Sequence, residues 1–504
     1  MNERERGGSA SLAPIGAGAT ARLVGAAIGA VTGILTTSIS VRLLGLTDYG
    51  ALAFAFSLTA LAAGFARLGL AAGTARAVAA FNVSGNGEEV ERTIRGAITI
   101  LFVSGLAGAV TIVAVLQFAP EGLSSNVRWT VGVSLGVMLV GSNVATSAAF
   151  LARGLGRMGL MEVPPATIGI VRFAAVATLA LLGVADIRAV AIGYGAAALV
   201  AMWVSGVIAR RLLAGARQIF RPAPEAARRL LSAVAPITLM GFASITISRL
   251  DVLVLGFTGT TTEVGIYEPT LRIVDKLLFL APLMFEAGML PEATRLFTSG
   301  DHEGFRNLYI TVTKLAFIVS FPAILVLTAF PEPVLRILYG PEFPVRPSIV
   351  WLLIAGHSVN LACGLNWMVL VATGHRRALT LSSAAIFGSA AVLAVTLVPA
   401  FGAIGAAAAT AGGLLILNLV AGYWLMRNER VHPFRRDMVT TILAAGVAIA
   451  AGVGIRETLH PAGLLPALVW TVVITLLWVG TILSLRSTSI SEWRSLLPSR
   501  GRAA

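Results

Sequence analysis

Long apolar segments separated by short polar ones make up most of the chain. A helix that crosses a membrane needs about 20 mostly apolar residues. Fourteen stretches approach or meet that length: 21–41, 51–70, 96–118, 129–151, 164–184, 187–208, 232–257, 266–289, 309–330, 347–371, 379–398, 401–424, 438–455 and 464–485. The pattern therefore predicts an all-α integral membrane protein with about fourteen transmembrane helices.

The basic residues provide a test of that count. If the chain begins in the cytoplasm, 26 of the 38 Lys and Arg residues lie in inner segments, 6 in outer segments and 6 within spans. Lys and Arg collect in the cytoplasmic loops of membrane proteins. A missed span would invert every later loop, so the alternation predicts a cell-membrane protein with both termini in the cytoplasm.

Composition excludes several soluble classes. The chain is 57% hydrophobic and 12% charged, whereas soluble proteins are about a quarter charged. Its net charge of +14 lies on short segments between apolar runs, which argues against a nucleic-acid partner. The five histidines are scattered and Cys363 is the single cysteine, so we expect no metal site, no disulfide and no bound cofactor.

Two halves of the sequence resemble each other. Leu-Gly pairs end at Gly45 and Gly256, 211 positions apart, and Ala-Ile-Gly triplets end at Gly193 and Gly405, 212 apart. Such a steady offset indicates a duplication. Transporters built from repeats place their substrate path between the repeats.

The basic segment 209–231 separates the repeats as a cytoplasmic linker. We therefore predict two six-helix lobes, 1–208 and 232–425, around a central cavity. Residues 426–504 would add a further helix pair and a basic cytoplasmic tail.

Charged residues in the seventh and eighth spans have matching depths. Asp251 and Arg272 are equidistant from the centre of the turn 258–265, and so are Arg249 and Asp275. A charge at the bilayer centre costs at least ~2.5–3.5 kcal/mol, so it needs a partner or a water-filled cavity. The matching depths predict two ion pairs within the hairpin.

Lys276 has no partner in this scheme. It lies about 15 Å from the outer end of its span at 1.5 Å per residue, and only it and Lys314 among the basic residues are lysines. A flexible ammonium suits a phosphate oxygen that must be bound and released. The mid-membrane groups carry a net charge of +2, which predicts an anionic cargo: Arg172, Arg249, Arg272 and Lys276 against Asp251 and Asp275.

His357 also lies near mid-depth, in the span 347–371. It is a candidate to carry a coupling proton, as are Asp251 and Asp275 when unpaired. Hydrogen bonding between helices is the alternative role for His357.

Several motifs resemble one family. They are RLLGLTDYG at 42–50, LGL at 68–70, GIY at 265–267, LVATGHR at 370–376 and PAFGAIGAA at 399–407. The chain resembles, over about residues 15–425, the polysaccharide-biosynthesis flippases, which are the Wzx-type members of the multidrug/oligosaccharidyl-lipid/polysaccharide exporter superfamily.

The resemblance implies two six-helix lobes around a cationic cavity. It also implies translocation of a polyprenyl-diphosphate-linked oligosaccharide to the outer leaflet by alternating access, coupled in many members to H⁺ or Na⁺. The diphosphate would bind Arg172, Arg249, Arg272 and Lys276. Expected partners are the anionic lipid-linked glycan, membrane lipids and a polysaccharide polymerase machinery.

Two other classes fit less well. A drug/cation antiporter of the same superfamily usually has twelve spans and takes cationic drugs, which a net positive centre repels.

A membrane glycosyltransferase or polymerase needs a large outer loop with catalytic carboxylates. The longest outer loop, 331–346, carries Glu332 and Glu342 among four prolines and favours a rigid connector. We therefore expect a transporter and not an enzyme.

Overall fold

The computed structural model describes residues 13–67, 69–118, 124–213, 220–364, 366–374, 376–459 and 463–485. Within these ranges the chain forms sixteen helices. They are α1 (Ala13–Arg67), α2 (Leu70–Val83), α3 (Gly87–Gln117), α4 (Ser125–Gly154), α5 (Met158–Met161), α6 (Val163–Leu181), α7 (Ile187–Leu212), α8 (Pro224–Thr258), α9 (Thr261–Thr298), α10 (His302–Ala329), α11 (Pro331–Tyr339), α12 (Pro347–Cys363), α13 (Asn366–Ala372), α14 (Arg376–Asn428), α15 (Arg436–Leu459) and α16 (Leu464–Ser484).

The predicted all-α membrane architecture is confirmed. Among the described residues, ten helical stretches are long and apolar enough to cross a membrane. Two predicted turns lie inside long helices: α1 bends at Gly45, where φ is 74°, and α14 bends at Gly402, where φ is 56°. Glycine adopts positive φ without a steric penalty, so each bend separates two arms that match two predicted spans. The number of membrane crossings stays a prediction.

Two predicted segments differ in detail from the structure. The span 347–371 consists of α12 and α13, which Gly364 separates with a φ of 76°. The loop 331–346 contains the short helix α11, which begins at a proline, a residue that suits the first turn of a helix.

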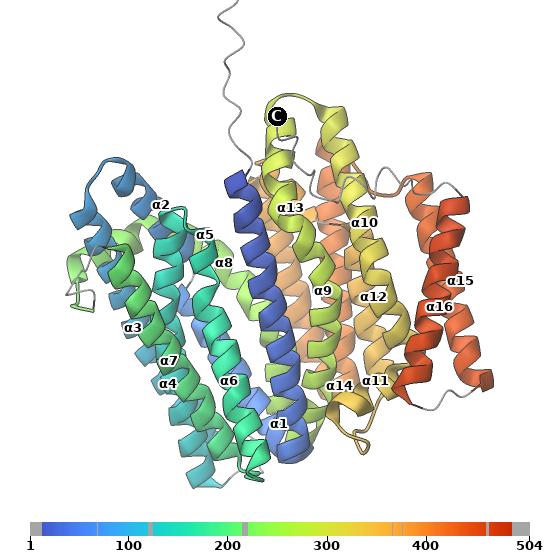
Figure 1. Cartoon of the computed structure of the whole chain (residues 1–504), viewed down its shortest axis with the longest axis horizontal. Coiled ribbons are helices and arrows are strands. Elements are labelled where there is room, and N and C mark those ends of the chain that lie inside the picture. The colour runs from blue at the N-terminus through green and yellow to red at the C-terminus, as the bar shows by residue number, and fades with distance from the viewer. Residues whose placement is uncertain are drawn as a thin grey trace, which may run out of the picture.

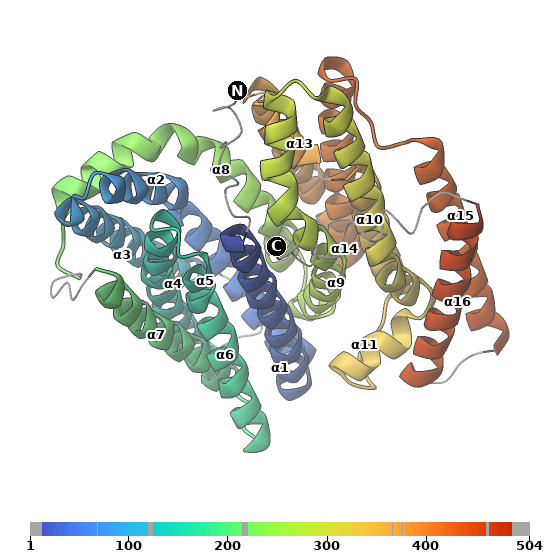
Figure 2. The ribbon, with the colours of Figure 1, turned by 45° about the horizontal axis from the view of Figure 1, so that its top comes forward.

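The predicted linker 209–231 is partly helical, because α8 begins at Pro224. The first turns of α8 pack against α3, where a β-carbon added at Gly96 would lie 2.8 Å from the carbonyl carbon of Ala226. Figure 2 shows α8 running from beside α2 and α3 to the middle of the molecule. The lobe boundaries at 208, 231 and 425 stay predictions.

The helices gather on two sides of the molecule (Figure 1). Helices α3, α4, α6 and α7 lie on one side, and α10, α12 and α14 lie on the other, with α1 and α9 between them. Helices α15 and α16 pack against the outside of α10. Lys314 of α10 forms an ion pair with Asp437 of α15 at 3.1 Å. This lysine therefore ties the last helix pair to the rest of the molecule and takes no part in the cavity described below.

Two glycines bring α1 and α9 together at one end of the molecule. A β-carbon at Gly50 would overlap the carbonyl oxygen of Thr261, and one at Gly265 would overlap the carbonyl oxygen of Leu46. Segments 45–50 and 259–265 thus meet backbone to backbone, and the predicted topology places them on the outer side of the membrane. We call this contact the outer contact.

Replacing Gly50 with alanine tests the outer contact. The hydroxyl oxygens of Thr47 and Thr262 lie 3.0 Å apart across it. With Cys363 changed to serine, a Thr47→Cys/Thr262→Cys pair should form a disulfide readily. Overpacking costs about 1–3 kcal/mol, so Gly50→Ala should slow this cross-linking by about fivefold or more.

Gly29→Ala in the same helix is the matched control. No atom lies within 4 Å of the position of its added β-carbon. It should leave the cross-linking rate of the parent unchanged. Equal rates in the two alanine variants would contradict the close approach of α1 and α9.

Candidate substrate cavity

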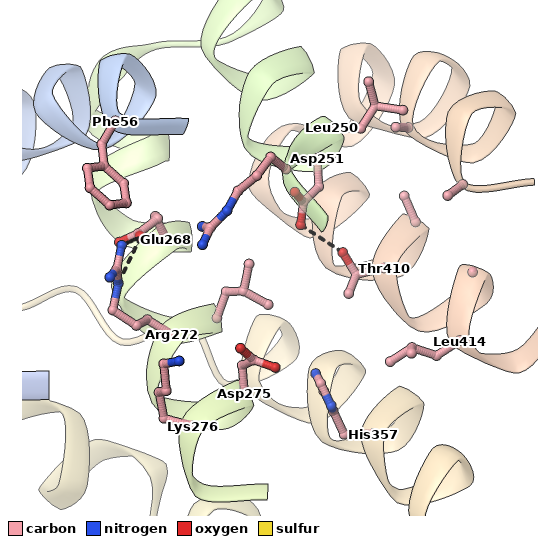
Figure 3. A pocket seen from close by; sticks show the side chains of 16 residues that line it. Phe56, Leu250, Asp251, Glu268, Arg272, Asp275, Lys276, His357, Thr410 and Leu414 are labelled. Atoms are coloured by element: carbon pink, nitrogen blue, oxygen red, sulfur yellow. Dashed lines mark hydrogen bonds and ion pairs between the residues drawn. The ribbon is translucent and has the colours of Figure 1, made fainter. Parts of the chain in front are cut away.

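A cavity of about 380 Å³ lies among α8, α9, α12 and α14 and reaches Phe56 of α1. Half of its apolar lining residues are alanines or a glycine of α14. Its polar lining gathers six of the seven residues predicted from the sequence, together with two others (Figure 3): Arg249, Asp251, Glu268, Arg272, Asp275, Lys276, His357 and Thr410.

Arg172 is the predicted residue that lies apart. It lines a smaller cavity of about 20 Å³ with Tyr194 of α7 and several residues of α1, among them Tyr49. Phe56 and Arg272 line both cavities and so form the wall between them. The four predicted cations therefore do not share one site in this structure.

Aromatic rings surround the guanidinium of Arg172. It lies 5.4 Å from the ring centre of Phe56 and 5.0 Å from that of Tyr194. Arg272 lies 5.7 Å from the centre of the same Phe56 ring. Cation–π attraction to this ring stabilises both guanidiniums, which line the same small cavity. The Nε atom of Arg172 is buried with no hydrogen-bond partner among the described residues.

Arg272 pairs with Glu268 and not with Asp251, so the pair predicted from matching depths is wrong. Glu268 lies one helical turn before Arg272 on α9, and its Oε1 accepts from Nε at 2.9 Å and from Nη2. Its Oε2 accepts from the hydroxyl of Tyr49 at 2.5 Å. Glu268 is 1% exposed, and both of its oxygens are occupied.

Asp251 has neutral partners. Its Oδ2 accepts from the hydroxyl of Tyr267 at 2.5 Å and from Thr410 Oγ1 at 2.9 Å. Its Oδ1 accepts from the main-chain N–H of Val252 at 2.8 Å. These bonds join α8, α9 and α14 around a residue that is 7% exposed.

The predicted Arg249–Asp275 ion pair is also absent from the described part of the chain. Both side chains are half-buried at the cavity wall. Asp275 faces His357 across the cavity (Figure 3), and the Nε2 atom of His357 is buried with no partner in the described ranges. Hydrogen bonding between helices therefore does not account for that nitrogen.

Lys276 has no ion pair within the segments that the structure describes, as the sequence predicted. Its ammonium enters the cavity from α9, one residue after Asp275 (Figure 3). Arg249 is likewise unpaired there. The cavity thus presents two cations that are not committed to a protein carboxylate.

The charge balance needs one correction. The predicted net charge of +2 for the mid-membrane groups did not include Glu268, which is a buried anion. Four cations against three anions leave +1 at the centre of the molecule.

Comparison with known proteins identifies the family. The sequence matches the family described as "Polysaccharide biosynthesis protein" over residues 15–291, which is more than half of the chain. The chain belongs to this polysaccharide biosynthesis protein family.

A curated relative supports that assignment. The probable low-salt glycan biosynthesis flippase Agl15 of Haloferax volcanii is 24% identical over 182 residues. The match covers 35% of this polysaccharide biosynthesis protein and 38% of that flippase, so it spans well under half of each.

Solved structures share the fold. An inward closed lipid II flippase MurJ superposes with a TM-score of 0.69, 13% identity, and 92% and 97% coverage of this chain and that one. An inward-facing multidrug resistance MATE transporter of the MOP superfamily gives 0.65, 15% identity, and 82% and 98% coverage. This polysaccharide biosynthesis protein therefore has the fold of MOP superfamily transporters.

Sequence reasoning missed Glu268, Tyr49 and Phe56. Glu268 lies near the outer end of its span, where a carboxylate reaches water easily, and Phe56 is one apolar residue among many. The spacing of four between Glu268 and Arg272 was the available signal, because such residues face each other on a helix.

A double-mutant cycle tests which carboxylate pairs with Arg272. Arg272→Met leaves Glu268 buried without its cation, so the free energy of unfolding in micelles should fall by about 3–5 kcal/mol. Glu268→Gln in the same chain should recover about 0.5–3 kcal/mol of that loss. Denaturation by titrated sodium dodecyl sulfate measures both values.

The matched cycle combines Arg272→Met with Asp251→Asn. Because Asp251 bonds to Tyr267 and Thr410, these effects should add to within about 0.5 kcal/mol. Strong coupling of Arg272 to Asp251, with none to Glu268, would restore the pairing predicted from depth.

Proposed function

We propose that this polysaccharide biosynthesis protein is a flippase that moves a polyprenyl-diphosphate-linked oligosaccharide from the cytoplasmic to the outer leaflet by alternating access. The observation that carries the proposal is the pair of unpaired cations, Lys276 and Arg249, in a cavity between membrane helices. An unpaired charge at that depth is costly, which indicates a ligand of opposite charge.

The size of the cavity suits a headgroup. At about 380 Å³ it falls at the lower end of ordinary ligand sites, which measure about 300–1,000 Å³. A diphosphate with its first sugar fits that space. The rest of the glycan would extend toward water, and the polyprenol would stay among the membrane lipids.

Each cation has a distinct part in the proposal. Lys276 and Arg249 receive the diphosphate first, because neither forms an ion pair with a carboxylate of the described residues. Arg272 offers a planar guanidinium that binds phosphate oxygens in pairs, but it must first leave Glu268. Arg172 lines the smaller cavity beyond Phe56 and Arg272, and it reaches the headgroup only when those side chains move.

The comparisons support the same class of cargo. The family is one of polysaccharide biosynthesis, Agl15 is named a glycan biosynthesis flippase, and MurJ is named a lipid II flippase. Delivery of the glycan to a polymerase machinery at the cell membrane extends the proposal.

Coupling to H⁺ or Na⁺ belongs to the same proposal. Asp275 and His357 face each other across the cavity, and Asp251 is a buried carboxylate beside it. These three residues are the candidates for the coupling ion. Flipping rates in proteoliposomes with an imposed proton or sodium gradient test that role, and rates that ignore both gradients would remove it.

A drug/cation antiporter is the second candidate. The observation in its favour is the set of three carboxylates at the cavity wall, together with the likeness to MATE transporters. Binding of cationic dyes in place of pyrophosphate would favour this alternative.

Replacing Lys276 with glutamine tests the flippase proposal. Removing one charge-assisted bond to the diphosphate costs about 1.5–3 kcal/mol, so flipping of a fluorescent polyprenyl-diphosphate glycan in proteoliposomes should fall at least about tenfold. Lys276→Arg retains the charge and should retain part of the rate. Arg188→Gln, at an exposed surface pair with Asp186, is the control and should flip at the parent rate. A normal rate in Lys276→Gln would remove Lys276 from the mechanism.

A further inference from the structure

The carboxylate of Glu268 joins α1 to α9, the two helices that lie between the two sides of the molecule. It accepts from Tyr49 of α1 through one oxygen and from Arg272 of its own helix through the other. Tyr49 is 3% exposed and Glu268 is 1% exposed, so neither group exchanges its partner for water.

The hydrogen-bonded group of Tyr49, Glu268 and Arg272 lies next to the outer contact. Tyr49 immediately precedes Gly50, whose backbone meets Thr261. Glu268 lies three residues after Gly265, whose backbone meets Leu46. The Tyr49–Glu268 bond is thus a polar link between the same two segments that the glycines bring together.

Arg272 connects this link to the cavity. Its side chain lines the cavity of about 380 Å³ together with Lys276 (Figure 3), and it is 17% exposed. A diphosphate held at Lys276 and Arg249 would therefore be adjacent to the guanidinium. Phosphate and carboxylate oxygens bind the same two-pronged face of an arginine, so the two anions compete for it.

We infer that Glu268 is a positioning residue that couples binding of an anionic headgroup to release of the outer contact. The inference rests on the proposed function and concerns the regulation of the same cavity. Phosphate oxygens take Arg272 from Glu268. The carboxylate then remains buried without its cation and beside the new negative charge, which destabilises the closed arrangement.

Separation of α1 from α9 relieves that destabilisation, because it admits water to Glu268. A ligand shifts a conformational equilibrium only through different interactions with the two states. With ligand bound, the closed arrangement leaves the buried carboxylate of Glu268 without its cation. The separated arrangement lets water solvate that carboxylate, so the ligand favours separation. A neutral or cationic ligand that leaves Arg272 on Glu268 would produce no such shift.

The disulfide pair at positions 47 and 262 provides the test. Full-length protein with Cys363→Ser, Thr47→Cys and Thr262→Cys is reconstituted in nanodiscs, and cross-linking is timed with and without inorganic pyrophosphate. Binding of radiolabelled pyrophosphate is measured on the same samples. Saturating pyrophosphate should slow cross-linking about fivefold or more, the lower end of typical coupling between sites.

Two variants distinguish the role of Glu268 from a structural one. Glu268→Gln keeps an oxygen that accepts from Tyr49 but leaves no charge behind when Arg272 departs. Its cross-linking should stay fast in the presence of bound pyrophosphate. Tyr49→Phe removes the link between the two segments, so its cross-linking should be slow already without pyrophosphate.

Tyr339→Phe is the matched control. Its hydroxyl donates to the carbonyl of Pro269, the residue after Glu268, at 2.8 Å, but not to the carboxylate. It should respond to pyrophosphate as the parent does.

The outcomes distinguish this inference from the proposed function. If pyrophosphate binds but does not slow cross-linking in the parent, the role of Glu268 is overturned. The same holds if pyrophosphate slows cross-linking equally in the parent and in Glu268→Gln. Either result leaves the flippase proposal standing. Pyrophosphate that does not bind contradicts both. A parent that fails to cross-link without ligand contradicts the outer contact and with it this inference.

Discussion

The buried carboxylate of Glu268 is the interaction on which the rest of the arrangement depends. It is bonded from two sides, by Tyr49 of α1 and by Arg272 of α9, and it lies beside the close approach of Gly50 to Thr261. A buried charge is tolerated only when it is paired and hydrogen-bonded. The position of α1 against α9 and the orientation of Arg272 are therefore fixed by the same group.

The cavity charges follow from this constraint. Arg272 is committed to Glu268, and the ring of Phe56 contacts both its guanidinium and that of Arg172. Lys276 and Arg249 remain as the unpaired cations in the described part of the cavity. The larger cavity thus presents two cations without an ion pair to a described residue, whereas Arg172 lies among aromatic rings at the smaller cavity.

Sequence alone predicted the helices and their order well, because apolar length determines whether a segment crosses a membrane. The unpaired state of Lys276 was also predicted, since the sequence offers no acidic residue at its depth in the neighbouring span. The predicted ion pairs were wrong because the depth of a residue in the membrane does not determine the direction in which its side chain points around the helix axis. Glu268, four residues from Arg272 on the same helix, faces it directly, whereas Asp251 turns toward Tyr267 and Thr410.

Arg172 illustrates the same limit. Its depth matched that of the other cations, but it lines a separate, smaller cavity, and Phe56, which looks like any apolar residue in a span, forms part of the wall between the two cavities. A lateral barrier of this kind depends on packing between helices distant in sequence.

The most direct test of the flippase account is the pool of lipid-linked glycan in a strain that lacks this polysaccharide biosynthesis protein. The account predicts that a polyprenyl-diphosphate-linked oligosaccharide accumulates on the cytoplasmic side while surface polysaccharide is lost. An unchanged pool and an unchanged surface, with increased sensitivity to toxic cations, would contradict it in favour of a drug/cation antiporter.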